Sequence, residues 1–152
     1  MVNIRVARGE DASRLAEIEV FNYRLSFYPI FGCDKFYFDE LSVSSIAEKY
    51  NENKKLIAHT YVYDDGVVKG FIRIAGREVE KLFVEPVLHG KFIGARLLEY
   101  VIEKHGITFL WVLEKNTDAM RFYERHGFHK TNDMKLEEGT DEYLLKMVRP
   151  TH

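Results

Sequence analysis

The chain has 152 residues, of which 46% are apolar and 30% are charged. These values are typical of one folded domain and exclude a mainly disordered chain. With 22 Lys and Arg against 24 Asp and Glu, the formal net charge is −2, which argues against a dedicated nucleic-acid-binding protein. The lone cysteine, Cys33, excludes an internal disulfide and a zinc site built from several cysteines. We therefore expect a single domain over residues 1–152.

No stretch approaches the roughly 20 apolar residues of a membrane-spanning helix, and the N-terminal residues lack the apolar core of a signal peptide. A single cysteine also fits a reducing compartment. We expect a cytoplasmic protein that binds neither membranes nor nucleic acid.

Hydrophobic periodicity predicts the elements of the first half. It indicates a strand at 2–6, a helix from Asp11 to about Phe27, and a short serine-capped helix within 29–53. Residues 56–63 and 67–75 predict two strands joined by a tight turn.

The second half predicts a strand at 78–84, a helix at 90–104 and an apolar strand at 107–113. A helix from Asn116 to His126 and strands near 128–136 and 141–148 follow. The strand–helix–strand stretch should form a right-handed parallel crossover, with antiparallel hairpins before and after it. We expect a mixed α/β (α+β) sheet.

Residues 81–101 run from an apolar strand through a loop with Gly90 and Gly94 into a helix. Free backbone amides and the positive end of a helix dipole meet at such a junction, which suits a phosphate or pyrophosphate. In isolation, such a glycine pair more often serves only a turn and close packing.

Two segments together carry a family pattern. The matching residues are Val84, Pro86, Gly90, Lys91, Ile93 and Gly94 in the first segment and Asn116, Ala119, Phe122, Tyr123, Gly127 and Phe128 in the second. The pattern resembles the GNAT superfamily of acyl-CoA-dependent N-acetyltransferases, and the resemblance covers nearly the whole chain. It implies a GNAT-like fold, with a central, mostly antiparallel mixed sheet of about seven strands flanked by about four helices.

The resemblance also implies acetyl-CoA as co-substrate. Backbone groups of one strand would pair with the pantetheine arm, loop amides would hold the pyrophosphate, and Asn116 would contact the cofactor, act as a helix N-cap, or do both. The implied cofactor-binding residues are Leu82, Phe83, Val84, His89, Gly90, Lys91, Phe92, Ile93, Gly94, Ala95, Asn116, Ala119 and Tyr123.

Two residues depart from the family pattern. His89 stands where the family motif has Gln or Arg, and Phe92 stands where the motif has the first of its two glycines. A side chain then stands where the backbone usually approaches the pyrophosphate, unless Phe92 adopts helical φ and ψ and its ring swings away.

For the chemistry, the resemblance points to Tyr123, whose phenol could donate to the departing thiolate. An ammonium acceptor must lose a proton, and Glu78 or Glu80, two apart on one strand, could receive it. The alternatives are a packed core tyrosine and two solvated glutamates.

Eight of the 21 aromatic residues fall between positions 21 and 38. In the family this region covers the acceptor, so Phe27, Tyr28 and Phe31 are candidate substrate-binding residues. A local hydrophobic core or a dimer surface would explain the cluster equally well.

The six histidines, at positions 59, 89, 105, 126, 129 and 152, form no convincing ligand set, so we predict no metal. The expected acceptor is a primary amine: a small amine or polyamine first, a protein N-terminus or lysine second. Direct attack in a ternary complex is the expected mechanism, by a monomer or homodimer. The rival interpretation is a non-catalytic acyl-CoA-binding or sensor domain.

Overall fold

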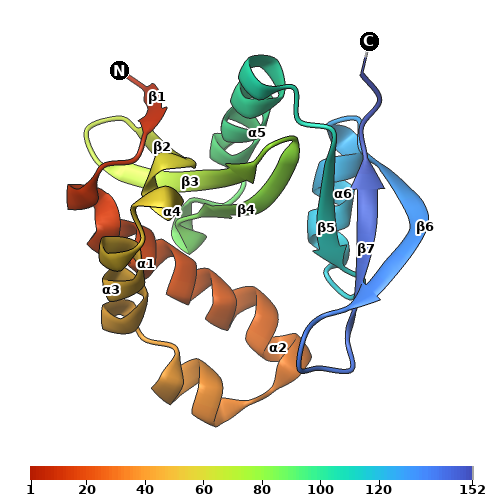
Figure 1. Ribbon diagram of the computed structural model, residues 1–152, viewed down its shortest axis with the longest axis horizontal. Helices are drawn as coiled ribbons and strands as arrows, with labels where there is room; N and C mark the ends of the chain where they lie inside the picture. Colours follow the sequence, from red (N-terminus) through yellow and green to blue (C-terminus); the bar gives the residue numbers. More distant parts are fainter. Residues whose placement is uncertain (152) are drawn as a thin grey trace. The chain divides into compact units, whose positions relative to one another are not determined.

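The computed structural model describes residues 1–151, which contain one seven-stranded sheet with the strand order β1-β2-β3-β4-β5-β7-β6 (Figure 1). The strands are β1 Asn3–Val6, β2 Thr60–Asp64, β3 Val68–Ala75, β4 Glu78–Val84, β5 Phe109–Leu113, β6 His129–Leu136 and β7 Tyr143–Val148. The mixed α/β class and the seven strands predicted from the sequence are confirmed.

Six α-helices accompany the sheet in the described residues, where the sequence predicted about four. They are α1 Ala12–Asn22, α2 Tyr28–Phe31, α3 Val43–Glu52, α4 Lys54–Ala58, α5 Ile93–His105 and α6 Thr117–Arg125. Within those residues, no helix is long and apolar enough to cross a membrane.

The chain divides into two compact units. The first unit comprises Met1–Arg73 and Lys81–Tyr100, and the second comprises Ile74–Glu80 and the chain from Val101 on. Each unit is described by itself below. A single domain stays a prediction from the sequence.

In the first unit, the apolar face of α1 covers strands β2 and β3. Leu15 and Ile18 of α1 pack with Val62 of β2 and Phe71 of β3 in one buried cluster. Both strand pairs, β1 with β2 and β2 with β3, are antiparallel, which confirms the predicted hairpin at residues 64–66. At roughly 2 kcal/mol for each large buried side chain, this cluster is a main source of the unit's stability.

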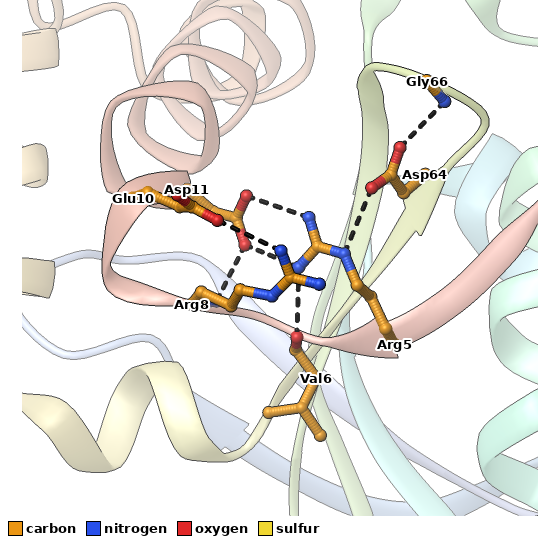
Figure 2. A network of polar contacts seen from close by, with 7 residues as sticks. All are labelled: Arg5, Val6, Arg8, Glu10, Asp11, Asp64 and Gly66. Atoms are coloured by element: carbon orange, nitrogen blue, oxygen red, sulfur yellow. Dashed lines mark hydrogen bonds and ion pairs between the residues drawn. The ribbon is translucent and has the colours of Figure 1, made fainter.

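A network of charged side chains connects the first residues of this unit to the β2–β3 hairpin, as Figure 2 shows. The guanidinium of Arg5 donates to both carboxylate oxygens of Asp11, at 2.8 and 3.1 Å, and to Asp64 at 3.1 Å. The backbone N–H of Arg8 donates to Asp11 at 2.7 Å, and Asp64 accepts from the N–H of Gly66 at 2.9 Å. The network therefore ties β1 and the first helical turn to the β2–β3 hairpin.

In the second unit, β7 lies between β5 and β6 and is antiparallel to both (Figure 1). The start of β4 pairs with β5 in parallel, through Glu78↔Phe109 and Val79↔Leu110. This confirms the parallel strand–helix–strand connection and the antiparallel hairpin after it. Among the buried residues are Leu110, Met147 and Phe128.

The predicted strand at 56–63 is wrong in its first half. Residues Lys54–Ala58 form helix α4, because Asn53 caps it by accepting from Lys55 N at 3.1 Å. Leu56 and Ile57 then pack against the core cluster from a helix, and the strand starts at Thr60. A short apolar run has no period that separates the two structures.

The predicted end of the first long helix, near Phe27, is wrong: α1 ends at Asn22, and helical turns continue without a break to Phe31 at the end of α2. After Asn22 the chain continues as a π-helical turn, Tyr23–Phe27, and a second π-helical turn follows at Phe36–Glu40. Such turns are rare, and they occur often at functional sites.

Candidate active site

The first group of candidate residues lies at the junction between β4 and α5, in the first unit. The strand ends at Val84, a short 3₁₀ turn spans Pro86–Leu88, and α5 begins at Ile93. The N–H of Arg96 donates to the carbonyl of Phe92 at 3.1 Å, the start of the helical hydrogen-bond ladder. The first N–H groups of a helix have no acceptor within it, so the amides of Ile93–Ala95 are left for an outside acceptor, as an anion site would require.

The strand that leads into this junction lies close to its neighbour. A Cβ built on Gly70 of β3 would lie 3.1 Å from the carbonyl oxygen of Phe83 and 3.3 Å from the Val84 side chain. Gly70 therefore permits a close approach that a larger residue would prevent. It fixes the course of Leu82, Phe83 and Val84, the residues expected to pair with the pantetheine arm.

The carbonyl of Val84 is engaged inside the protein. It accepts from Asn22 Nδ2 at 2.8 Å and lies 2.9 Å from His89 Nε2. A carbonyl has two lone pairs, so both are used. Leu82 is therefore a better candidate than Val84 for accepting a hydrogen bond from a pantetheine amide, since the Phe83 carbonyl faces Gly70 of β3.

His89 is turned away from the expected pyrophosphate position. Its ring contacts the Val84 carbonyl, and its backbone N–H donates to Pro86 O at 3.2 Å. The ring and the backbone N–H of His89 are thus both engaged by residues just before it in the chain. Of the amides predicted to bind an anion at 89–95, those from Gly90 onward remain candidates.

Phe92 does not adopt the helical backbone that the sequence allowed. Its φ is +66°, and it is the one non-glycine residue with positive φ within residues 1–151. Gly90 in the same turn has φ +82°, so the turn uses two left-handed residues to direct its amides. A Cβ there costs on the order of 1 kcal/mol. The Phe92 ring is 77% exposed, so packing offsets little of that cost.

The second group of candidate residues lies on α6, in the second unit. Asn116 caps this helix, because its Oδ1 accepts from the N–H of Ala119 at 3.3 Å. The N-cap alternative considered from the sequence is thus confirmed, and Nδ2 is the part of the side chain that the cap leaves to a ligand. Ala119 itself is half-buried on the first turn.

Tyr123 stands near the end of α6 and is half-buried. Its ring packs edge-on against Phe122 and Phe128, with centroid distances of 5.3 and 5.8 Å. Burial raises the pKa of the phenol well above its ordinary value. The group therefore stays protonated and can act as a donor at neutral pH.

Glu78 and Glu80 lie at the start of β4, in the same unit as Tyr123. Glu78 is half-buried and Glu80 is exposed. Burial and the charge of Glu80 raise the pKa of Glu78, and the ammonium groups of Lys135 and Lys146 oppose the rise. A carboxylate with a raised pKa is a stronger proton acceptor, which favours Glu78 of the two as a general base.

The aromatic segment of the first unit is mainly a local core. Phe27, Tyr28 and Phe31 pack against the buried residues Val20, Tyr37 and Leu41. Phe27 also lies 5.1 Å from Tyr23, and Tyr23 lies 5.3 Å from Phe83 of β4, between ring centroids. Of the three candidate substrate-binding residues, Phe27 is the one tied by rings to the strand of the expected cofactor site.

Sequence reasoning missed several polar residues behind this aromatic surface. Glu19, Asn22 and Tyr50 are buried, and Lys81 is half-buried and paired with Glu19. Asn22 follows Ile18 by four residues on the apolar face of α1, a signal that it needs a buried partner. Lys81 gives no such signal, because a lysine between Glu80 and Leu82 is typical of a solvated strand position.

Among residues 1–151, no group of three or more His, Cys, Asp or Glu side chains could hold a metal ion. His152, one of the six histidines, lies outside the described residues.

Comparison with known proteins finds a partial match to one family and to its curated members. Residues 57–130 match the family model for the acetyltransferase (GNAT) domain. The peptidyl-lysine N-acetyltransferase YiaC of Escherichia coli K12 is 38% identical over 74 residues, which are 47% of this chain and 51% of YiaC. The chain thus spans about half the length of this curated relative. In these residues it is similar to GNAT acetyltransferases.

Solved structures show the same fold at lower identity. Apo-form YjaB from Escherichia coli has a TM-score of 0.70 at 21% identity, and the match covers 97% of both chains. The PaiA N-acetyltransferase of Thermoplasma acidophilum, solved in complex with coenzyme A, has a TM-score of 0.65 at 22% identity. That match covers 96% of this chain and 98% of the PaiA chain.

Proposed function

We propose that this protein transfers an acetyl group from acetyl-CoA to a primary amine by direct attack in a ternary complex. The observation that carries the proposal is the junction of β4 and α5, where an exposed turn precedes a 13-residue helix and its first amides lie outside the helical ladder. The match of residues 57–130 to the GNAT domain model and the similarity to YiaC support the same activity. Cytoplasmic location and a monomeric or dimeric state stay predictions from the sequence.

The residues present fit the cofactor in most respects. The amides of Gly90–Ala95 would hold the pyrophosphate, Lys91 would add positive charge, and the backbone of Leu82 and Phe83 would pair with the pantetheine amides. The Nδ2 of Asn116 would add a contact from α6.

In the reaction, the neutral amine attacks the thioester carbonyl carbon, a C–N bond forms, and the C–S bond breaks. Tyr123 would donate a hydrogen bond or a proton to the departing sulfur. Glu78, with Glu80 as the alternative, would take the proton that the acceptor ammonium must lose, directly or through water. No covalent enzyme intermediate is needed.

The curated relatives favour a protein amine over a small amine as the acceptor. The sequence favoured a small amine or polyamine over a protein amine, whereas YiaC is a peptidyl-lysine N-acetyltransferase. We therefore place a lysine side chain of a polypeptide first.

A second candidate, a non-catalytic acyl-CoA-binding or sensor domain, is favoured by one observation. Phe92 stands with positive φ in the turn where the family has glycine, and His89 is engaged internally. Both features could weaken the hold on the pyrophosphate.

The decisive experiment is CoA release from acetyl-CoA with a panel of lysine peptides, small amines and polyamines, accompanied by a CoA binding titration. Turnover with any of these acceptors supports the enzyme. CoA binding without turnover on the whole panel would establish the sensor domain instead, and absence of CoA binding would overturn both.

A further inference from the structure

A polar cluster is buried in the first unit, and apart from Lys81 its members lie outside the motifs that the sequence analysis singled out. The carboxylate of Glu19 on α1 accepts from Tyr50 Oη of α3 at 2.6 Å and from Lys81 Nζ of β4 at 3.1 Å. Arg73 of β3 donates to the same Tyr50 oxygen at 3.2 Å. Burying such groups is costly unless they are paired, so the cluster holds α1, α3, β3 and β4 in one arrangement.

The cluster opens to solvent at Lys81. Its side chain is 25% exposed, against 4% for Glu19, so an external molecule can reach the lysine side chain and not the carboxylate. Nζ is hydrogen-bonded to Tyr23 Oη and lies 5.0 Å from the centroid of the Tyr23 ring. An ammonium has three N–H donors, and Glu19 and Tyr23 account for two of them. The third is available to a ligand.

The Lys81 ammonium group lies next to residues that are expected to bind the acceptor amine and the cofactor. Tyr23 stacks with Phe27, the candidate substrate-binding residue, and with Phe83, on the strand of the expected cofactor site. Phe27 and Phe83 also contact each other, with centroids 6.3 Å apart. Lys81 thus places a hydrogen-bond donor beside a group of three aromatic rings, those of Tyr23, Phe27 and Phe83.

We propose that Lys81, held by Glu19, is a specificity-determining residue that donates a hydrogen bond to an amide carbonyl oxygen of a peptide acceptor. The inference rests on the proposed function and names its substrate class. A polyamine carries several ammonium groups and no acceptor oxygen, so it leaves this donor unmatched and meets a like charge. Glu19 offsets part of that charge, and the hydrogen bond therefore supplies most of the discrimination.

The test compares two acceptors, a blocked lysine peptide with neutral flanking residues and spermidine. In the wild type, kcat/KM should favour the peptide. Lys81→Met should reduce the peptide-to-spermidine ratio by roughly 10 to 100-fold, the size of a hydrogen bond from a charged donor. The change should lie in the KM of the peptide, with the affinity for acetyl-CoA unchanged.

Two further variants control for the unpaired charge of Glu19 and for the loss of a lysine elsewhere in the unit. Lys81→Met leaves Glu19 buried without its partner, so the double variant Glu19→Gln/Lys81→Met removes both charges together and should show the same loss of discrimination. Lys69→Met is the matched control, because Lys69 is 31% exposed and pairs with Asp65 at 2.6 Å outside the cluster. It should keep the wild-type ratio.

An unchanged ratio in the folded double variant, or a wild-type preference for spermidine, would overturn the inference while leaving the enzyme intact. If the wild type acetylated neither acceptor, the wider acceptor panel described above would decide the proposed function. Calorimetric titration of both acceptors into the CoA-saturated protein then decides the inference alone. Tighter peptide binding that is lost in the double variant supports it, and equal affinities in the wild type refute it.

Discussion

At the scale of single residues, Tyr123 carries the chemistry of the proposed reaction. Tyr123→Phe keeps the packing against Phe122 and Phe128 and removes the hydroxyl. Turnover should fall by roughly 10 to 1,000-fold, in the range of a lost proton donor, while acetyl-CoA affinity stays nearly constant. Steady-state kinetics and a CoA titration measure both. Phe122→Leu is the control for ring packing, and wild-type turnover in Tyr123→Phe would remove the phenol from the mechanism.

Glu78 is the second residue whose role can be isolated. Because burial and the charge of Glu80 raise its pKa, the acidic limb of kcat/KM should lie at higher pH than an ordinary glutamate would give. The base form exists above that pKa, so activity should rise as pH increases through it. Glu78→Gln should abolish this limb, and Glu80→Gln should leave a limb in place. A pH profile with the reverse pattern would assign the base to Glu80.

Phe92 tests whether the left-handed turn is strained. Phe92→Gly removes the Cβ from a residue with φ +66° and loses little burial, because the ring is exposed. We expect the free energy of unfolding to rise by up to about 1 kcal/mol and CoA to bind more tightly. Urea unfolding and a CoA titration check this. Phe92→Ala removes the ring but keeps the Cβ, so equal stability in the two variants would show that strain is absent.

At the scale of elements, the contact between β1 and the β2–β3 hairpin depends on the charge of Asp11. Burial alone would raise the pKa of this carboxyl, but hydrogen bonds from Arg5 and the N–H of Arg8 hold it below its usual range (Figure 2). A lowered native pKa gives stability that is present above the unfolded value of about 4 and is lost as pH falls through the native value.

Asp11→Asn should therefore destabilise the protein by about 2 kcal/mol at pH 7 and flatten the loss of stability in acid. Urea unfolding at pH 7 and at several points below pH 4 measures the effect. Glu10→Gln is the control, since Glu10 pairs with Arg8 at an exposed position. Equal acid sensitivity of Asp11→Asn and the wild type would show that Asp11 gives no pH-dependent stability.

The elements also show how far sequence reasoning reaches. Helix α6 was predicted with its N-cap, because Asn116 and the turn at Gly127 are local signals. Helix α4 was missed because its five residues give no readable period. The π-helical turn at Tyr23–Phe27 was also missed, since it changes which side chains face β4 without changing the apolar pattern.

At the scale of the whole molecule, the order of the seven strands along the chain was predictable, whereas the polar contacts between distant elements were not. The motif residues on α6 and in the loop before α5 are short-range patterns that one sequence displays. Glu19, Tyr50 and Lys81 are far apart in the chain, and their pairing depends on how α1, α3 and β4 pack. The backbone of Phe92 was not predictable either, because it is the turn as a whole that imposes the left-handed conformation.

The stability of the whole protein provides the last test of the proposed cofactor. A ligand that binds the native state alone adds about 2.7 kcal/mol at 100 times its Kd, and a chain of this size should then melt about 5–10 °C higher. CoA should produce this shift in the wild type, read by the fluorescence of Trp111, the single tryptophan. Gly94→Asp puts a carboxylate in the first turn of α5 and should lose the shift. Gly9→Asp adds the same charge where a Cβ meets nothing within 4 Å and should retain it. A shift that survived in Gly94→Asp would place the pyrophosphate elsewhere, and no shift in the wild type would remove CoA as the ligand.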